Sequence, residues 1–515
     1  MKRPNILLVM ADQMAAPALP VYGHDVVQAP HMERLAHSGV VFDAAYCNSP
    51  LCAPSRFSMM SGRLPSRLGA YDNAANFPSD VPTMAHYLRA AGYHTCLSGK
   101  MHYVGPDQLH GFEERLTTDI YPADFGWTPD WDNPDFRIDW WYHNMLSVKQ
   151  AGVAETTNQL DFDDEVGFQA IRKLREYARG HNERPWFLTV SFTHPHDPYA
   201  MRQVFWDRYD HDQIDLPKIA EIPYQEKDPH SRRLYELSAM SQYEITSDDI
   251  RNARHGYYAA ISYVDDWLGR LGETLATGGM ADDTIVIFTA DHGDMLGERG
   301  LWYKMCFYEW ATNVPLIVWA PRLFESRRVS TLVSLVDLLP TLCELGKTPA
   351  PLEPVDGSSL LPLLEGASSP GEVLAEYMGE GAIAPMFMIR RGRYKYVASR
   401  PDLPQLFDLE ADPNELVNLA THPDHTDTAA ALADETARRW DAAAIHDQVL
   451  TSQRVRRVIT AALGEGQHTA WDHQPFRDAS RLYMRNHLDL NDVERGRRFP
   501  PPADPAPAVA DKVNR

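Results

Sequence analysis

Short apolar runs rich in β-branched and aromatic residues recur along the first part of the chain. They cover residues 5–10, 93–97, 186–192 and 284–289. The longer segments between them place apolar residues at helical spacing, over 82–91, 163–179 and 257–275. Short apolar runs separated by helices are typical of buried parallel strands. The pattern therefore predicts an α/β fold with a large central, mostly parallel sheet flanked by helices.

Each predicted strand is followed by polar residues of the kinds that bind ions or transfer protons. The pairs are Asp12 and Gln13, Lys100 and His102, His194 and His196, and Asp291 and His292. In open α/β sheets, ligands bind at the carboxyl ends of the strands. We therefore expect these residues to converge on one site.

The chain becomes rich in proline after residue 348, and the periodic pattern stops there. We predict that an N-terminal catalytic domain, residues 1–348, ends at this point. Residues 349–450 contain shorter strand candidates, including a hairpin over 386–397, and are predicted to form a smaller α+β subdomain. Residues 451–515 are predicted to be a C-terminal extension that mediates oligomerisation and is partly disordered at its end.

Composition and charge restrict the classes of function. The 515 residues include 49 basic and 71 acidic side chains, a formal net charge of −22. This charge argues against nucleic acid or an anionic membrane as a partner, because phosphate binding needs a basic surface. The five cysteines lack the spacing of a zinc site or a disulfide framework. No apolar run is long enough for a signal sequence or a membrane span, so we expect a soluble, cytoplasmic protein.

The segment from Leu51 to Arg56 reads Leu-Cys-Ala-Pro-Ser-Arg. By itself, Cys52 could be a small core residue. The Cys-x-Pro-Ser-Arg run, however, resembles the maturation signature of type I sulfatases of the alkaline phosphatase superfamily, in which a formylglycine-generating enzyme oxidises the cysteine to an aldehyde. The resemblance implies the alkaline-phosphatase-like sulfatase fold. It also implies that one hydroxyl of the hydrated aldehyde attacks sulfur, giving a covalent sulfate ester that the second hydroxyl breaks down.

The carboxylates at the strand ends and the modified cysteine form a candidate metal site. Asp12, Asp291 and His292, with formylglycine at Cys52, supply oxygen-rich ligands and one imidazole. Such ligands favour Ca²⁺, with Mg²⁺ or Mn²⁺ as alternatives. Each aspartate alone could instead cap a helix. Gln13 stands where the family more often has a second aspartate, which leaves the identity of the metal open.

Further motifs imply the residues that handle charge and protons. Gly99-Lys100-Met101-His102 resembles the sulfatase Gly-Lys-x-His motif, in which the lysine binds sulfate and the histidine is the general base. His196 and Lys304 match the segments that protonate the leaving group, and His194 is predicted to be structural.

Arg56 is a further catalytic candidate, four residues after Cys52. If Pro54 begins a helix, Arg56 lies in the first turn. It could there steady the diol and contact an anion at the helix N-terminus.

Stretches 45–56, 376–381, 471–475 and 483–487 resemble the choline-sulfatase branch of the family. The resemblance implies cytoplasmic hydrolysis of choline-O-sulfate by a homo-oligomer, a dimer or a tetramer, that assembles through the C-terminal extension. Aromatic faces and carboxylates bind quaternary ammonium groups, although such aromatic residues could also be core. The predicted substrate contacts are Asn73, Trp127, His143, Asn144, Glu380 and, from a neighbouring subunit, an acidic residue such as Asp489.

Three other functions stay open on the sequence. A phosphonate monoester or phosphodiester hydrolase of the same superfamily shares the Asp-Gln start, the formylglycine and the Asp-His pair. A broader alkyl or aryl sulfatase would use the same chemistry on other esters. A binding protein with little turnover would result if Cys52 stayed a thiol.

Overall fold

The structure is a computed structural model and describes residues 3–134, 137, 143–180, 184–467, 469–476, 487 and 489. Its centre is an eight-stranded sheet with the order β11-β2-β10-β9-β1-β7-β4-β5. The strands are β1 (Asn5–Asp12), β2 (Val40–Phe42), β4 (His94–Gly99), β5 (Glu114–Arg115), β7 (Trp186–Pro195), β9 (Thr284–Ala290), β10 (Leu316–Trp319) and β11 (Arg327–Val329).

The four strands predicted from the apolar runs lie side by side in the order β9-β1-β7-β4. All three pairs among them are parallel. Every residue of β1 is buried, as expected for a strand that is covered on both faces. The predicted α/β class is therefore confirmed. The sheet is mixed because β10 runs antiparallel to both β9 and β2.

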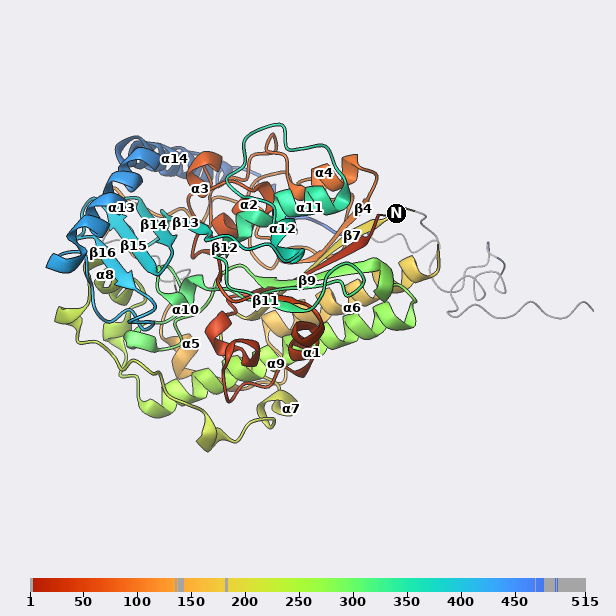
Figure 1. Ribbon diagram of the computed structural model, residues 1–515, viewed down its shortest axis with the longest axis horizontal. Coiled ribbons are helices and arrows are strands. Elements are labelled where there is room, and N and C mark those ends of the chain that lie inside the picture. Colours follow the sequence, from red (N-terminus) through yellow and green to blue (C-terminus); the bar gives the residue numbers. More distant parts are fainter. Residues whose placement is uncertain are drawn as a thin grey trace, which may run out of the picture.

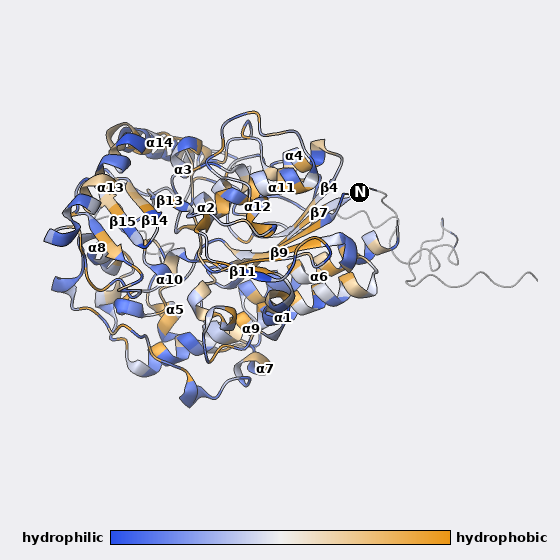
Figure 2. Ribbon diagram, in the orientation of Figure 1, coloured by the Kyte–Doolittle hydropathy of each residue, from blue (hydrophilic) through white to orange (hydrophobic). Residues whose placement is uncertain are grey.

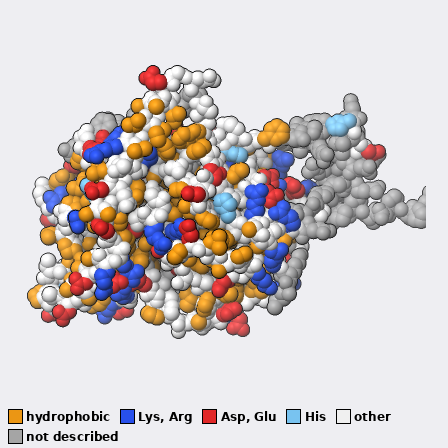
Figure 3. Space-filling model, turned by 90° about the horizontal axis from the view of Figure 1, so that it is seen from above, with side chains coloured by type: hydrophobic (Ala, Val, Ile, Leu, Met, Phe, Trp, Pro, Cys, Tyr) orange, Lys and Arg blue, Asp and Glu red, His pale blue; other side chains and the backbone are white. Residues whose placement is uncertain are grey.

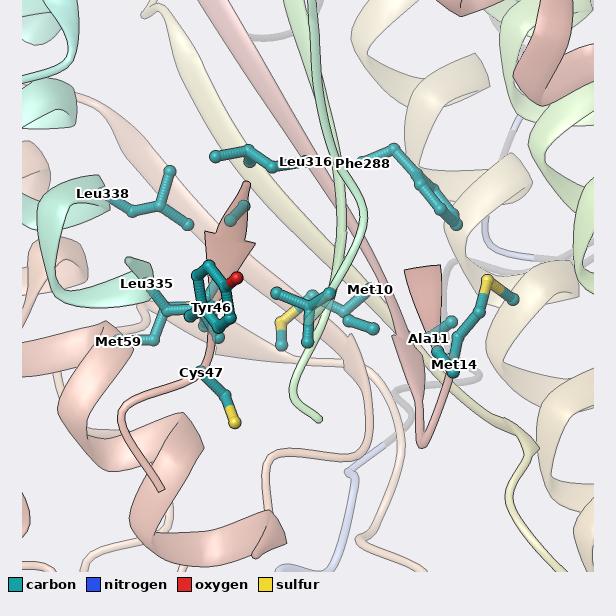
Figure 4. Close-up of a cluster of buried hydrophobic side chains, with 14 of the residues drawn as sticks. Met10, Ala11, Met14, Tyr46, Cys47, Met59, Phe288, Leu316, Leu335 and Leu338 are labelled. Carbon is teal, nitrogen blue, oxygen red and sulfur yellow. The ribbon is translucent and has the colours of Figure 1, made fainter. Parts of the chain in front are cut away.

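Helices cover both faces of this sheet (Figure 1). One face is covered by α1 (Pro30–Ser38), α6 (Asn158–Ala178) and α9 (Ser247–Thr277), and the other by α2 (Cys52–Ser61), α4 (Met84–Ala90) and α11 (Leu338–Gly346). Hydrophobic residues concentrate on the strands between these layers (Figure 2). In Figure 4, Met59 of α2 and Leu338 of α11 lie on one side of the strands, and Phe288 and Met14 on the other. All four are buried.

Helix α2 begins at Cys52 rather than at Pro54. Pro54 takes the third position, where the missing N–H is not needed because the first N–H groups of a helix have no intrahelical acceptor. Arg56 therefore lies at the fifth position, and the prediction that places it in the first turn is wrong. The helix ends before Gly62, whose φ of 69° suits glycine.

A second, antiparallel sheet follows, with the order β13-β14-β15-β16. Its strands are β13 (Glu372–Tyr377), β14 (Met386–Arg391), β15 (Tyr394–Ser399) and β16 (Gln405–Asp408). The pairing of β14 with β15 confirms the predicted hairpin. Helices α13 (Thr426–Arg439) and α14 (Ala442–Leu463) come next, and α14 lies near α3 (Pro65–Leu68) at the top of Figure 1.

Shorter elements connect these layers. They are β3 (Ala45–Tyr46), β6 (Gly152–Val153), β8 (Ala200–Met201), β12 (Val333–Ser334), α5 (Leu146–Lys149), α7 (Gln203–Trp206), α8 (Pro229–Leu237), α10 (Glu309–Thr312) and α12 (Leu361–Leu364). On the face seen in Figure 3, basic and acidic side chains are interspersed with apolar ones. Across the described part of the chain, no helix combines the length and the apolar character that crossing a membrane requires.

Candidate active site

Four buried side chains meet at the carboxyl ends of β1 and β9. Asp12 ends β1, Asp291 and His292 follow β9, and Cys52 begins α2. One ligand atom from each lies within 4.8 Å of the others. The Sγ atom of Cys52 is 3.2 Å from Nε2 of His292 and 3.9 Å from Oδ1 of Asp12. The fold thus brings the predicted metal ligands together, and two carboxylates with one imidazole suit a divalent cation.

Two buried cations compensate the carboxylates. Lys100 forms an ion pair with Asp12, and Arg56 donates to Oδ2 of Asp12 at 2.9 Å and to Oδ2 of Asp291 at 2.8 Å. Burial by itself would raise the pKa of Asp12, but Lys100 and Arg56 hold it well below its ordinary value. Arg56 is completely buried and does not line the cavity described below. In this geometry it fixes two carboxylates instead of contacting an anion.

Cys52 lies at the wall of a cavity and is only 1% exposed. Burial, together with the charge of Asp12, raises the pKa of its thiol to about 12. An unmodified thiol is therefore protonated at neutral pH and a weak nucleophile. The next residue, Ala53, donates its backbone N–H to Oδ1 of Asn73 at 3.0 Å, so Asn73 caps the start of α2.

His102 lies next to Lys100 in a tight turn after β4. Its φ is 57°, and its backbone N–H donates to Oδ2 of Asp119 at 2.9 Å, as does that of Met101 at 3.0 Å. Neither ring nitrogen has a hydrogen-bond partner among the described residues. Burial, reinforced by Lys100, lowers the pKa of His102 to about 3. The ring is therefore neutral at pH 7 and can accept a proton.

His196 and Lys304 form a close pair that lines the same cavity as Cys52. Nζ of Lys304 lies 2.8 Å from Nε2 of His196 and donates to Oε1 of Gln13 at 2.5 Å. Burial and the charge of Lys304 lower the pKa of His196 well below its ordinary value. His194 points elsewhere, with Nδ1 2.7 Å from Oδ2 of Asp163, in line with its predicted structural role.

Asp294 orients this pair without lining the cavity. Its Oδ2 accepts from Nε2 of Gln13 at 2.6 Å and from the hydroxyl of Tyr199 at 2.8 Å. Its Oδ1 accepts from the backbone N–H of Tyr303 at 3.0 Å, next to Lys304. Gln13 and Tyr303 both have φ near 65°, an uncommon conformation for non-glycine residues. Asp294 thus stabilises two strained positions that together place the ammonium group of Lys304.

Three catalytic candidates and most of the predicted substrate contacts line one cavity of about 390 Å³. The catalytic candidates among its lining residues are Cys52, His196 and Lys304, whereas Arg56, Lys100 and His102 do not line it. The other predicted residues that line it are Asn73, Trp127, His143, Asn144 and Glu380. Asp489 is exposed and does not line this cavity. Most of the stretch 483–487 lies outside the described residues.

The walls of the cavity combine aromatic rings with a buried carboxylate. His143 stacks on Tyr303 with ring centroids 4.3 Å apart, and the rings of Trp127 and His102 form a T-shaped pair with centroids 5.7 Å apart. Glu380 is 5% exposed and its Oε2 has no hydrogen-bond partner in the described structure. Burial raises the pKa of Glu380 to about 7. Such a carboxylate can bind a cation that has no N–H to donate.

Sequence reasoning missed several residues of the site. Tyr121 lines the cavity and lies under Lys100, with Nζ 4.2 Å from the ring centroid. Asp197 accepts from Ser147 at 2.9 Å and lies 3.4 Å from Nδ1 of His143. The position of Asp197 directly after the histidine at the end of β7 was a usable signal. For Tyr121, in a long loop, the sequence offers none.

The family model described as Sulfatase matches residues 4–348, which include the metal-type cluster, His196 and Lys304. The chain belongs to the sulfatase family. This sulfatase is accordingly a sulfuric ester hydrolase. Its later residues match two further models, described as N-sulphoglucosamine sulphohydrolase, C-terminal (residues 297–441) and Choline sulfatase enzyme C terminal (residues 447–499). The resemblance to the choline-sulfatase branch is thereby confirmed.

The sulfatase is similar to curated proteins over most of its length. Choline-sulfatase of Rhizobium meliloti (strain 1021) is 49% identical over 97% of this chain and 99% of its own. Arylsulfatase K of Gallus gallus is 29% identical over 81% of this chain and 79% of its own. Among solved structures, a phosphonate monoester hydrolase from Silicibacter pomeroyi has a TM-score of 0.69 at 24% identity, over 85% of this chain and 95% of that one. This last likeness concerns the fold alone.

Proposed function

We propose that this sulfatase hydrolyses choline-O-sulfate to choline and inorganic sulfate. The observation that carries the proposal is a single cavity whose lining combines Cys52, His196 and Lys304 with aromatic rings and the buried carboxylate of Glu380, of which Oε2 has no hydrogen-bond partner among the described residues. Choline-O-sulfate joins an anionic sulfate and a trimethylammonium group in one small molecule, which suits both kinds of lining. The similarity to the choline-sulfatase of Rhizobium meliloti supports the same substrate.

The cofactors are part of this proposal. Formylglycine at Cys52, made by a formylglycine-generating enzyme, would supply the attacking hydroxyl and a second hydroxyl that allows sulfate to leave. A divalent cation, with Ca²⁺ favoured over Mg²⁺ and Mn²⁺, would be bound by Asp12, Asp291, His292 and position 52 and would polarise the sulfate oxygens.

The side chains around the cavity then have separate tasks. Lys100 and Lys304 stabilise negative charge on the sulfate group. The pair of Lys304 and His196 delivers a proton to the oxygen of the leaving choline, which is a poor leaving group without one. His102, neutral because of its lowered pKa, accepts the proton that is released when the sulfate ester breaks down.

The experiment compares turnover of choline-O-sulfate, nitrophenyl sulfate and a phosphonate monoester on protein whose Cys52 peptide shows the aldehyde by mass. We expect the highest kcat/KM on choline-O-sulfate. A Cys52→Ala variant serves as the blank for contaminating activity. Faster cleavage of the phosphonate would replace the proposal with a phosphonate monoester hydrolase. Equal rates on both sulfates would indicate a broader alkyl or aryl sulfatase.

Assembly is a separate part of the proposal. We expect a homo-oligomer formed through residues 451–515, with an acidic residue such as Asp489 completing the cavity of a neighbouring subunit. Light scattering of the full chain and of a chain that ends at residue 463 tests the assembly. A Asp489→Asn variant with an unchanged KM for choline-O-sulfate would argue against the shared cavity.

A further inference from the structure

Helix α14 lies outside the cavity but contacts the loops that form its walls. The walls include Asn73, Trp127 and Glu380, which belong to three separate segments of the chain. Two buried side chains of α14, Arg456 and Gln453, bind the segments that carry Asn73 and Trp127. The segment that carries Glu380 is connected to α14 through Trp131.

Arg456 joins two of the three segments. Its two terminal nitrogens donate to the two carboxylate oxygens of Asp72 at 2.6 and 2.7 Å, and Asp72 directly precedes Asn73. One of these nitrogens also donates to Oγ1 of Thr128 at 3.2 Å, next to Trp127. The side chain of Arg456 is 4% exposed and that of Asp72 is completely buried. A paired guanidinium fork of this kind fixes direction as well as distance.

Gln453, one turn earlier on α14, reaches the third segment indirectly. Its Oε1 accepts from the backbone N–H of Trp131 at 2.9 Å. The indole Nε1 of Trp131 in turn donates to the backbone carbonyl of Gly379 at 3.3 Å, and Glu380 follows. The loop that carries Trp127 therefore lies between α14 and the segment that carries Glu380.

We propose that Arg456 is a positioning residue for recognition of the cationic end of the substrate, acting through Asp72 and Thr128 on the walls formed by Asn73 and Trp127. The inference rests on the proposed function, because it assigns these walls to choline. Within the described residues, the side-chain hydrogen bonds of Arg456 involve Ser452, Asp72 and Thr128. Lys100 and Lys304, the proposed sulfate ligands, are instead held by Asp12, Gln13 and His196. Loss of Arg456 should therefore weaken binding of the cation more than binding of sulfate.

The geometry separates this role from a purely structural one. Loops that carry binding residues depend on a rigid scaffold for their precision, and displacement by about 1 Å can cost up to 100-fold in activity. Loss of a contact that only stabilised the fold would lower the melting temperature without changing the affinity for choline more than the affinity for sulfate.

The test uses choline and inorganic sulfate as separate competitive inhibitors of nitrophenyl sulfate turnover by the full-length enzyme. In Arg456→Met, we expect the Ki of choline to rise about tenfold. The Ki of sulfate should stay within about twofold of the wild-type value, because Lys100 and Lys304 are held by Asp12, Gln13 and His196 and not by α14. Equal Ki values of choline in a folded Arg456→Met variant and the wild type would overturn the inference.

Two further variants keep the test decisive if Arg456→Met does not fold, since it leaves the Asp72 carboxylate buried and unpaired. The double variant Asp72→Asn with Arg456→Met removes both charges. Arg456→Lys keeps the charge but loses the fork, so Asp72 and Thr128 can no longer both be contacted in the same geometry. In both variants we expect the Ki of choline to rise and the Ki of sulfate to stay within about twofold of the wild-type value. If the Ki of choline is unchanged in a variant that folds, the inference is overturned.

Arg208→Met is the matched control. Arg208 donates from two nitrogens to Asp266, a residue of α9 on the side of the sheet opposite α14 (Figure 1). The Arg208→Met variant should change neither the Ki of choline nor that of sulfate. If choline does not inhibit the wild-type enzyme at all, the proposed function fails, whereas inhibition that is the same with and without Arg456 contradicts only the positioning role.

Discussion

At the scale of single residues, the site depends on buried carboxylates that differ in their cationic partners. The metal-type carboxylate of Asp12 has two cationic partners, Lys100 and Arg56, and stays ionised. Glu380 forms no ion pair within the described part of the chain, and burial raises its pKa to about 7. Two carboxylates in one site thus differ in protonation because their surroundings differ.

This difference predicts how binding depends on pH. Because the raised pKa leaves Glu380 largely neutral below pH 7, the carboxylate that attracts a cation is lost as the pH falls through that value. We expect the Ki of choline to fall by up to about tenfold between about pH 6 and pH 8. Inhibition of nitrophenyl sulfate turnover measures it. In Glu380→Gln this pH dependence of the Ki of choline should disappear. If it persists, another group is responsible for the titration.

Asp294 allows a prediction about proton delivery. In Asp294→Asn, an amide N–H would face Nε2 of Gln13, so the Gln13 amide would have to turn over and would no longer accept from Lys304. We expect kcat on choline-O-sulfate to fall about 10- to 100-fold. Nitrophenyl sulfate should be affected less, because nitrophenolate leaves without a proton.

The comparison of the two substrates is the decisive readout for Asp294. Metal content should be measured alongside, since a loss of bound metal would slow both substrates equally. Asp266→Asn, on α9 far from the cavity, is the control and should leave both rates unchanged. An equal loss on both substrates at full metal content would contradict the positioning role of Asp294.

At the scale of elements, a buried ionic cluster joins β15 to the segment that carries Lys304. Nζ of Lys395 lies 2.6 Å from Oε1 of Glu309, at the start of α10, and 2.8 Å from Oε1 of Glu415. It also donates to the backbone carbonyl of Phe307 at 2.7 Å. The side chain of Lys395 is completely buried. The second sheet therefore fixes the position of residues 307–309, close in sequence to Lys304.

Removal of this lysine should destabilise the protein strongly. Lys395→Met would leave two carboxylates without their shared cation, and we expect a loss of about 3–5 kcal/mol in the free energy of unfolding. Denaturant titration measures it. Arg393→Met, directly before the same strand, removes a pair with Asp408 in which the arginine is 42% exposed, and should cost far less stability. Similar losses in both variants would show that the buried cluster contributes no more to the free energy of unfolding than the exposed pair.

At the scale of the whole molecule, the sequence allowed the central sheet and the metal-type cluster to be predicted for one reason. These strands are largely apolar, and residue types that bind ions stand at or just after their carboxyl ends, as Asp12 ends β1 and Asp291 follows β9. Both features can be read from short stretches of sequence. Because parallel strands end at the same edge of a sheet, the residues at their carboxyl ends are expected to lie together. The start of α2 was misjudged because a proline is tolerated anywhere in the first turn.

The positioning contacts could not be predicted in the same way. Gln13 and Asp294 are 281 residues apart, and Arg456 and Asp72 are 384 residues apart. No periodicity connects such positions, and an arginine in a helix is more often an exposed charge. Their roles depend on the path of loops, which residue patterns do not specify.

The central place of β1 also has a consequence for biosynthesis. Its neighbours on either side are β7 and β9, so β1 receives its second partner only after residue 290 has been made. At about 5–20 residues per second, that interval is roughly 14 to 56 s. During this time a strand that is apolar from residue 6 to residue 11 has at least one open edge, which is a template for pairing with other chains. Slow translation, or growth without chaperones, should therefore reduce the yield of this enzyme before any property of its finished site is affected.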